Sequence, residues 1–148
     1  MPFFCAVETI IPVRFVSIPP NGTHVVVAAF INGQLANVLI DTGASQTVMD
    51  RNRVGLFSTE TEFESTGQLS KGLGTEGMET FHFTLSQFIL GDLVLEPMQV
   101  TLLDLGHVNG SYEQLGLAPI DMVLGGDVLK DCTAVLDYGR AQMLLTQP

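Results

Sequence analysis

The sequence predicts an all-β domain, either a sandwich or a barrel. Short apolar segments alternate with turns rich in glycine, asparagine and proline along its 148 residues. No segment of useful length carries apolar residues at the 3.6-residue spacing of an amphipathic helix. Hydrophobic residues make up 46% of the chain and charged residues 15%, the opposite of a disordered composition. We therefore expect a packed core within a single domain.

In the first half of the chain we expect four strands. Ala6–Phe15 is an apolar segment that suits a first strand. His24–Ile31 is β-branched and apolar, as a buried strand should be. Asn32-Gly33 follows it, and this pair is the strongest short hairpin signal because both residues tolerate positive φ. Leu35–Ile40 is then the returning strand, and Thr47–Asp50 suits another short strand.

In the middle of the chain, strands alternate with polar loops. Residues 57–77 are rich in Gly, Ser, Thr and Glu, which predicts a loop or a hairpin. Residues 81–85 alternate Phe, His, Phe, Thr and Leu, and residues 98–102 also alternate apolar and polar side chains. A period of two indicates half-buried strands, with His82 on the polar face. Residues 106–119 are interpreted as a second loop.

The C-terminal part predicts one short helix between strands. Met122–Leu124 is a short apolar strand that ends at two glycines. Asp127 is predicted to cap a helix that ends near Lys130 or Asp131. Thr133–Asp137 and Gln142–Leu145 are expected to close the chain as a hairpin.

Charge and composition exclude several classes of partner. Six Lys and Arg stand against sixteen Asp and Glu, a net charge of −10, so the chain repels nucleic acids and anionic membranes. No apolar run approaches the ~18 residues that span a bilayer. Cys5 and Cys132 lack metal or redox spacing, and two free thiols favour a reducing compartment. We expect a cytoplasmic location, and a periplasmic one if a segment precedes residue 1.

The segment around Asp41 is the most informative one for function. Val38-Leu39-Ile40 carries this carboxylate to the end of a buried apolar strand, where a charge is costly to desolvate. Thr42 supplies a hydroxyl group, and Gly43, which has no Cβ, lets backbone N–H groups close on the carboxylate. The tripeptide Asp-Thr-Gly alone is also compatible with a plain turn. Its apolar approach, its Ala44-Ser45 tail and a second apolar element at Val123-Leu124-Gly125 favour a functional site.

In these segments the chain resembles the retropepsin-like aspartic peptidases, in particular single-domain members of the bacterial type. The resemblance spans about residues 24–145, so we divide the chain into an N-terminal extension, 1–20, and a peptidase domain, 21–148. It rests on four stretches: residues 39–45, Gly72-Leu73-Gly74-Thr75, residues 121–129 and residues 136–140.

The resemblance implies a closed β-barrel with one short helix near the C-terminus, assembled as a homodimer that cleaves peptides. Asp41 of each subunit would be catalytic, with Thr42, Gly43, Ala44 and Ser45 supporting the loop and Thr42 bonding across the dyad. Gly72, Leu73, Gly74 and Thr75 would form a flap over the substrate. Val123, Leu124 and Gly125 would line the cleft, and the strand around Met143-Leu144-Leu145 would help build an intersubunit sheet.

The implied chemistry needs two carboxylates, no metal and no cofactor. Two such groups about 3 Å apart share one proton, so one activates water and the other donates to the scissile carbonyl. Such a pair titrates as a unit, and we expect a bell-shaped pH profile on the acidic side of neutral. Asp137 is the other candidate acid in the chain, but its Tyr-Gly context predicts a turn residue. One catalytic loop per chain makes dimerisation a chemical requirement.

Several other functions were considered for the same residues. Residues 72–77 match GxGxxG but lack the strand-and-helix context of a dinucleotide site, so a flap or a plain loop remains. Ser45 lacks the second glycine of a nucleophile elbow. His24, His82 and His107 show no metal-ligand spacing. The alternative function is a catalytically silent peptide-binding or scaffolding dimer on the same fold.

Overall fold

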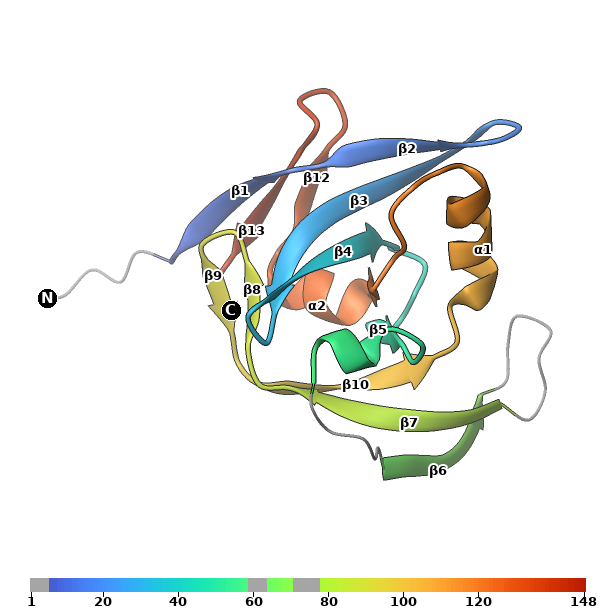
Figure 1. Cartoon of the computed structure of the whole chain (residues 1–148). Coiled ribbons are helices and arrows are strands. Elements are labelled where there is room, and N and C mark those ends of the chain that lie inside the picture. The colour runs from blue at the N-terminus through green and yellow to red at the C-terminus, as the bar shows by residue number, and fades with distance from the viewer. Residues whose placement is uncertain (1–5, 59–63, 71–77) are drawn as a thin grey trace, which may run out of the picture.

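A computed structural model of the chain describes residues 6–58, 64–70 and 78–148 (Figure 1). Within these residues the fold is mostly β, with thirteen strands, two α-helices and one 3-10 helix. The first half contains β1 (Glu8–Pro12), β2 (Arg14–Ile18), β3 (Gly22–Ile31), β4 (Gln34–Ile40), β5 (Val48–Asp50), η1 (Val54–Leu56) and β6 (Glu64–Ser70). The second half contains β7 (Met78–Leu85), β8 (Phe88–Leu90), β9 (Leu93–Leu95), β10 (Met98–Leu103), α1 (Gly106–Gln114), β11 (Met122–Leu124), α2 (Gly126–Asp131), β12 (Val135–Asp137) and β13 (Gln142–Thr146).

The described strands form two sheets. The larger follows the order β6-β7-β10-β5-β11-β4-β3-β8-β9, with β2 also paired to β3. Its pairs are antiparallel except β10 with β5 and β11 with β4, which are parallel. The smaller sheet has the order β1-β13-β12 and lies beside β3 in Figure 1.

The expected closed barrel is wrong, because the large sheet curls into an open half-barrel. Within the described residues β6 pairs only with β7 and β9 pairs only with β8, so the two ends of the strand order are not bonded to each other. The sheet instead wraps around a core that includes Ile31, Val38 and Leu124. Apart from residues 6–15, the expected strands are present, with ends shifted by a few residues.

The expected single strand over residues 6–15 is two strands, β1 and β2. They are separated at Val13, whose N–H donates to the carbonyl of Ala141 at 3.0 Å. β1 pairs with β13, and β2 pairs with β3. The part of the proposed N-terminal extension that the structure describes is therefore hydrogen-bonded to both sheets; the division at residue 20 stays a prediction.

The hairpin expected at Asn32-Gly33 is confirmed. Asn32 has φ of 49° and Gly33 has φ of 81°, the two positive values that a type I′ turn requires. The turn fixes the β3–β4 register, in which Val25 pairs with Ile40 and Val26 with Leu39. That register determines which side chains share a face beside Asp41.

Two helices are present where one was expected. The short helix near the C-terminus is confirmed as α2. The other, α1, occupies the segment interpreted as a loop, and its sequence GHVNGSYEQ buries only Tyr112. It carries too few apolar residues for a helical period. Its position depends instead on Asn109, which bonds the N–H and the carbonyl of Ile120 at 2.7 and 3.0 Å and Asp50 at 3.0 Å.

No helix in the described parts of the chain is long and apolar enough to cross a membrane. Cys132 is a free thiol with 0% exposure, and its burial, followed by the nearby charge of Asp131, raises the pKa of that thiol. Cys5 lies outside the described residues.

Candidate active site

Asp41 follows β4 directly, at the point where β4 and the parallel strand β11 end together. Ile40 pairs with Leu124 in this register, and the Asp41 N–H continues the pattern by donating to the Leu124 carbonyl at 3.0 Å. Buried apolar side chains thus hold the backbone up to Asp41, while the residue itself is exposed. The Asp41 carboxylate therefore faces solvent from the hydrogen-bonded ends of β4 and β11.

The loop after Asp41 turns back on the carboxylate. The N–H of Gly43 donates to Asp41 Oδ1 at 2.9 Å, and the N–H of Ala44 donates to the Asp41 carbonyl at 3.2 Å. The expectation that a backbone N–H closes on this carboxylate is therefore confirmed. Thr42 and Ser45 are exposed on the same loop. Their supporting roles stay predictions.

A second layer of contacts holds this loop from below. A Cβ atom on Gly125 would lie 2.7 Å from the Gln46 carbonyl carbon and 2.9 Å from the Ala44 oxygen, so only glycine fits there. The N–H of Gly126 donates to the Ala44 carbonyl at 2.7 Å. The loop that carries Asp41 therefore rests backbone to backbone on the start of α2.

Asp127 strengthens this contact and is a residue whose role the sequence analysis missed. It was expected to cap α2, but the N-cap position is Gly125, and Asp127 lies in the first turn. Its carboxylate accepts hydrogen bonds from the Thr47 hydroxyl at 2.7 Å and the Thr47 N–H at 3.1 Å, and the Thr47 hydroxyl accepts from the Gly125 N–H at 3.0 Å. The only signal in the sequence was an acid just after the two glycines.

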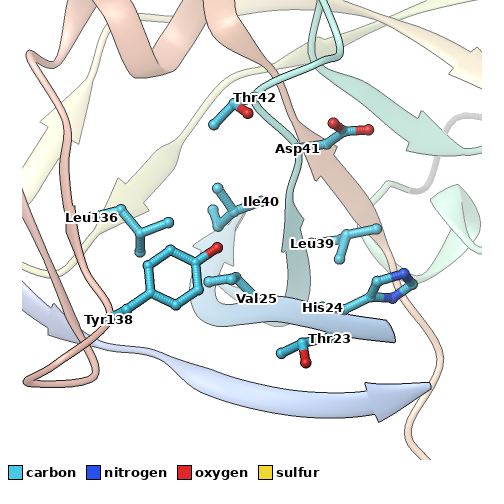
Figure 2. Close-up of a pocket in the computed structure, with 9 residues that line it drawn as sticks. All are labelled: Thr23, His24, Val25, Leu39, Ile40, Asp41, Thr42, Leu136 and Tyr138. Atoms are coloured by element: carbon cyan, nitrogen blue, oxygen red, sulfur yellow. The ribbon is translucent and has the colours of Figure 1, made fainter. Parts of the chain in front are cut away.

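A hollow of about 280 Å³ opens beside Asp41. Figure 2 shows its lining side chains, which come from β3, β4 with the following loop, and the β12–β13 hairpin. They are Thr23, His24, Val25, Leu39, Ile40, Asp41, Thr42, Leu136 and Tyr138. The catalytic candidate thus stands at the edge of a half-open space with both polar and apolar walls.

The three predicted cleft residues lie close to this loop but in different environments. Val123 pairs with Leu39, and both are 8% exposed within a cluster beneath α1. Leu124 has 0% exposure and belongs to the main core, while Gly125 is pressed against the loop. All three residues pack behind the loop that carries Asp41. Their role in lining a substrate cleft stays a prediction.

The predicted flap residues Gly72, Leu73, Gly74 and Thr75 lie outside the described residues. β6 and β7, on either side of them, pair antiparallel with Glu64 opposite His82 and Ser70 opposite Met78. For the described part of residues 57–77, this pairing agrees with the hairpin alternative. The two strands lie at one end of the large sheet (Figure 1).

The segment around α1 is organised by buried acids. Asp50, 1% exposed, accepts hydrogen bonds from the Leu105 N–H and the Asn109 side chain. Asp121, 4% exposed, accepts from the Asn37 N–H at 2.8 Å and from Arg53 Nε at 2.6 Å. These networks fix α1 next to β4 and β11.

Two further groups near α1 have shifted pKa values. Hydrogen bonds from the Gly106 N–H and then the Asn52 side chain lower the pKa of Asp104. Burial raises the pKa of Tyr112, and the nearby Arg14 charge partly opposes this. The Tyr112 hydroxyl lies 2.9 Å from His24 Nδ1. In the described residues no group of three or more His, Cys, Asp and Glu is placed to hold a metal ion.

A curled β-fold that presents an Asp-Thr-Gly loop at the ends of two parallel strands defines the class of aspartic proteases. Comparison with family models supports this class directly, because the model described as aspartyl protease matches residues 27–128. That match covers more than half of the chain. The chain therefore belongs to the aspartyl protease family, and its fold is retropepsin-like.

Solved structures share this fold at low sequence identity. A retropepsin-like aspartic protease from Rickettsia conorii is 15% identical, with a TM-score of 0.62 over 99% of this chain and 98% of that one. The EIAV protease in complex with the inhibitor HBY-793 is 21% identical, with a TM-score of 0.57 over 83% and 100%. The retroviral protease-like domain of Ddi1 from Leishmania major is 14% identical, with a TM-score of 0.53 over 83% and 93%. A search of curated proteins found no match.

Proposed function

We propose that this protein is a homodimeric aspartic endopeptidase in which the Asp41 carboxylates of two subunits activate one water molecule. The observation that carries the proposal is the setting of Asp41. It is an exposed carboxylate held by a Gly43 N–H on a loop that Gly125 and Asp127 support from the core.

A single chain offers no second carboxylate in a similar setting within its described residues. Asp137, the other candidate, accepts a hydrogen bond from the Arg140 N–H at 2.9 Å and forms an ion pair with the Arg140 side chain at 3.4 Å. That geometry is a turn that closes the β12–β13 hairpin. A second copy of the chain is therefore the source of the second acid.

A twofold axis beside Asp41 would make the contact isologous, so each subunit offers the other the same loop. Two carboxylates at about 3 Å cannot both ionise easily and share a proton. The ionised one takes a proton from water, and the protonated one donates to the scissile carbonyl oxygen. Thr42, exposed beside Asp41, would bond across the axis and hold the two loops in register.

The substrate would be an extended peptide that lies along the cleft and pairs its backbone with the hairpin of β6 and β7. The hollow beside Asp41 supports this, since it places open space next to the reacting group. The EIAV protease, which shares this fold, has been solved in complex with an inhibitor.

The first test replaces Asp41 by Asn and measures peptide cleavage between about pH 4 and 7. We expect a loss of at least about a hundredfold in kcat/KM, because acid–base catalysis contributes about that much or more. Asp92→Asn is the matched control, since Asp92 is exposed and lies in the turn between β8 and β9. Equal activity of wild type and Asp41→Asn would remove the catalytic assignment.

A mixing experiment tests the shared site. Wild type is equilibrated with a tenfold excess of Asp41→Asn, so that most wild-type chains pair with an inactive partner. Cleavage per wild-type chain should then fall several-fold, whereas chains that act alone would keep their activity. Binding of a pepstatin-like inhibitor by wild type without any product peptides would instead favour the silent peptide-binding dimer.

A further inference from the structure

His24 and Asp41 both lie at the end of the β3–β4 ladder. Val25 pairs with Ile40 there; His24 precedes Val25 on β3, and Asp41 follows Ile40 at the end of β4. His24 is half-buried and lines the same hollow as Asp41, as Figure 2 shows.

Tyr112 fixes the His24 ring from the other side. Its hydroxyl lies 2.9 Å from His24 Nδ1, and the two rings stack with centroids 5.8 Å apart. Tyr112 is 1% exposed, and its burial raises the pKa of its hydroxyl, so it stays a neutral partner. It donates to a neutral imidazole or accepts from a charged one, so the contact survives protonation of His24. No hydrogen bond within the described residues uses His24 Nε2.

The apolar surface on this face is largely closed by the α1 segment. Val26, Leu39 and Val123 are buried together with Leu105, Tyr112 and Ile120. The exposed or half-buried polar lining of the hollow is Thr23, His24, Thr42 and Tyr138, together with Asp41. The space next to the reacting carboxylate is therefore more polar than the adjoining apolar strands would suggest.

We propose that His24, positioned by Tyr112, contacts the substrate and selects a peptide with an acidic side chain beside the scissile bond. The proposal rests on the proposed function and deepens it by naming the substrate class. A protonated imidazole donates a charge-assisted hydrogen bond to a carboxylate, and such bonds are about twice as strong as neutral ones. In the sequence, the spacing of His24 from His82 and His107 only argues against a metal site and gives no such preference.

The neighbouring charges favour this selection locally. Arg14 on β2 pairs with Val26 on the same face and bonds to Asn37, so it adds a positive charge near His24 and Tyr112. Asp41 opposes it, but two Asp41 carboxylates that share a proton carry one negative charge between two His24 side chains. The net charge of −10 per chain repels acidic peptides in general, so an acidic preference at the cut requires this local site.

The selection should depend on pH in a defined direction. A peptide Glu loses its charge below about pH 4.3, whereas Gln carries no charge at any pH. The preference for Glu should therefore be lost as pH falls toward about 3. At that pH, Glu and its neutral isostere Gln should be cleaved about equally well.

The test uses a peptide that the wild type cleaves, with Glu, Gln or Leu placed in turn at each of the four residues nearest the cut. At pH 5.5 we expect kcat/KM for Glu to exceed that for Gln about tenfold at one position or more. His24→Gln should abolish the difference, and Tyr112→Phe should reduce it several-fold. His107→Gln, the same change at an exposed residue of α1, should leave it unchanged.

Binding provides a readout that needs no cleavage. Asp41→Asn protein should bind the Glu peptide more tightly than the Gln peptide at pH 5.5, and His24→Gln in the same background should equalise the two. If wild type cleaves all peptides but Leu is preferred and His24→Gln changes nothing, the inference is overturned and the peptidase assignment stands. If Asp41→Asn binds Glu and Gln peptides equally at pH 5.5, the inference is also overturned, whatever the activity.

Discussion

The two faces of β4 and β11 differ in how they are covered. On one face, Val38, Ile40 and Leu124 point into the main core and are packed between strands of the curled sheet. On the other face, Leu39 and Val123 belong to a smaller cluster that the α1 segment covers. We call these the core face and the cleft face.

The difference shows that one pair of strands serves two purposes. The core-face residues pack into the main core and so support the loop that carries Asp41. The cleft face includes Val26 and Leu39, and Leu39 also lines the hollow beside Asp41, so its cover decides what surrounds that carboxylate. Changes on the core face should act mainly on stability, and changes on the cleft face mainly on substrate turnover.

The largest effect on stability is expected on β11, where Leu124 and Val123 are neighbours on opposite faces. Leu124→Ala removes a fully buried side chain and should destabilise the protein by about 3 kcal/mol, because a cavity remains. Val123→Ala removes less apolar surface and should cost about 1.5 kcal/mol. Thermal unfolding measures both, and kcat/KM well below the melting temperature should fall more for Val123→Ala. The reverse order in kcat/KM would break the division into two faces.

A smaller loss of stability is expected at Asp127, which holds the Asp41 loop through Thr47. Asp127→Ala leaves the Thr47 N–H and hydroxyl without their acceptor and should destabilise the protein by about 2 kcal/mol. Asp127→Asn keeps one carbonyl oxygen and should cost about half as much. Urea unfolding gives the stabilities, and cleavage assays should show kcat falling more than KM rises, because the loop position changes. If both variants matched wild type in stability and kcat, Asp127 would not support the loop.

The smallest effect on stability is expected at Asp104, just before α1, the helix that covers the cleft face. Hydrogen bonds from the Gly106 N–H and from Asn52 lower the pKa of Asp104, so folding favours its ionised form. Its contribution is present above the unfolded value of about 3.9 and is lost as pH falls through the lower folded value. Asp104→Asn should cost under about 1 kcal/mol at pH 7, since the residue is exposed. Unfolding at pH 7 and near pH 2.5 checks this: the difference from wild type should be smaller at the lower pH.

The sequence by itself determined most of the longer strands, the Asn32-Gly33 hairpin and the position of Asp41 at the end of β4. These features follow from local rules, because a period of two, a positive φ and an apolar run ending in an acid are visible within a few residues. The match to the aspartyl protease family over residues 27–128 agrees with that interpretation. The helix α2 was also predictable, since two glycines and an acid mark its start.

Only the tertiary structure decided the openness of the sheet, the existence of α1 and the surroundings of Asp41. Closure depends on whether two distant edge strands meet, which no local pattern reports. The helix α1 is fixed by Asp50, Asn109 and Ile120, and Tyr112 reaches His24 across 88 positions of sequence. Such contacts form because side chains far apart in the chain satisfy one another's hydrogen bonds once the core has brought them together.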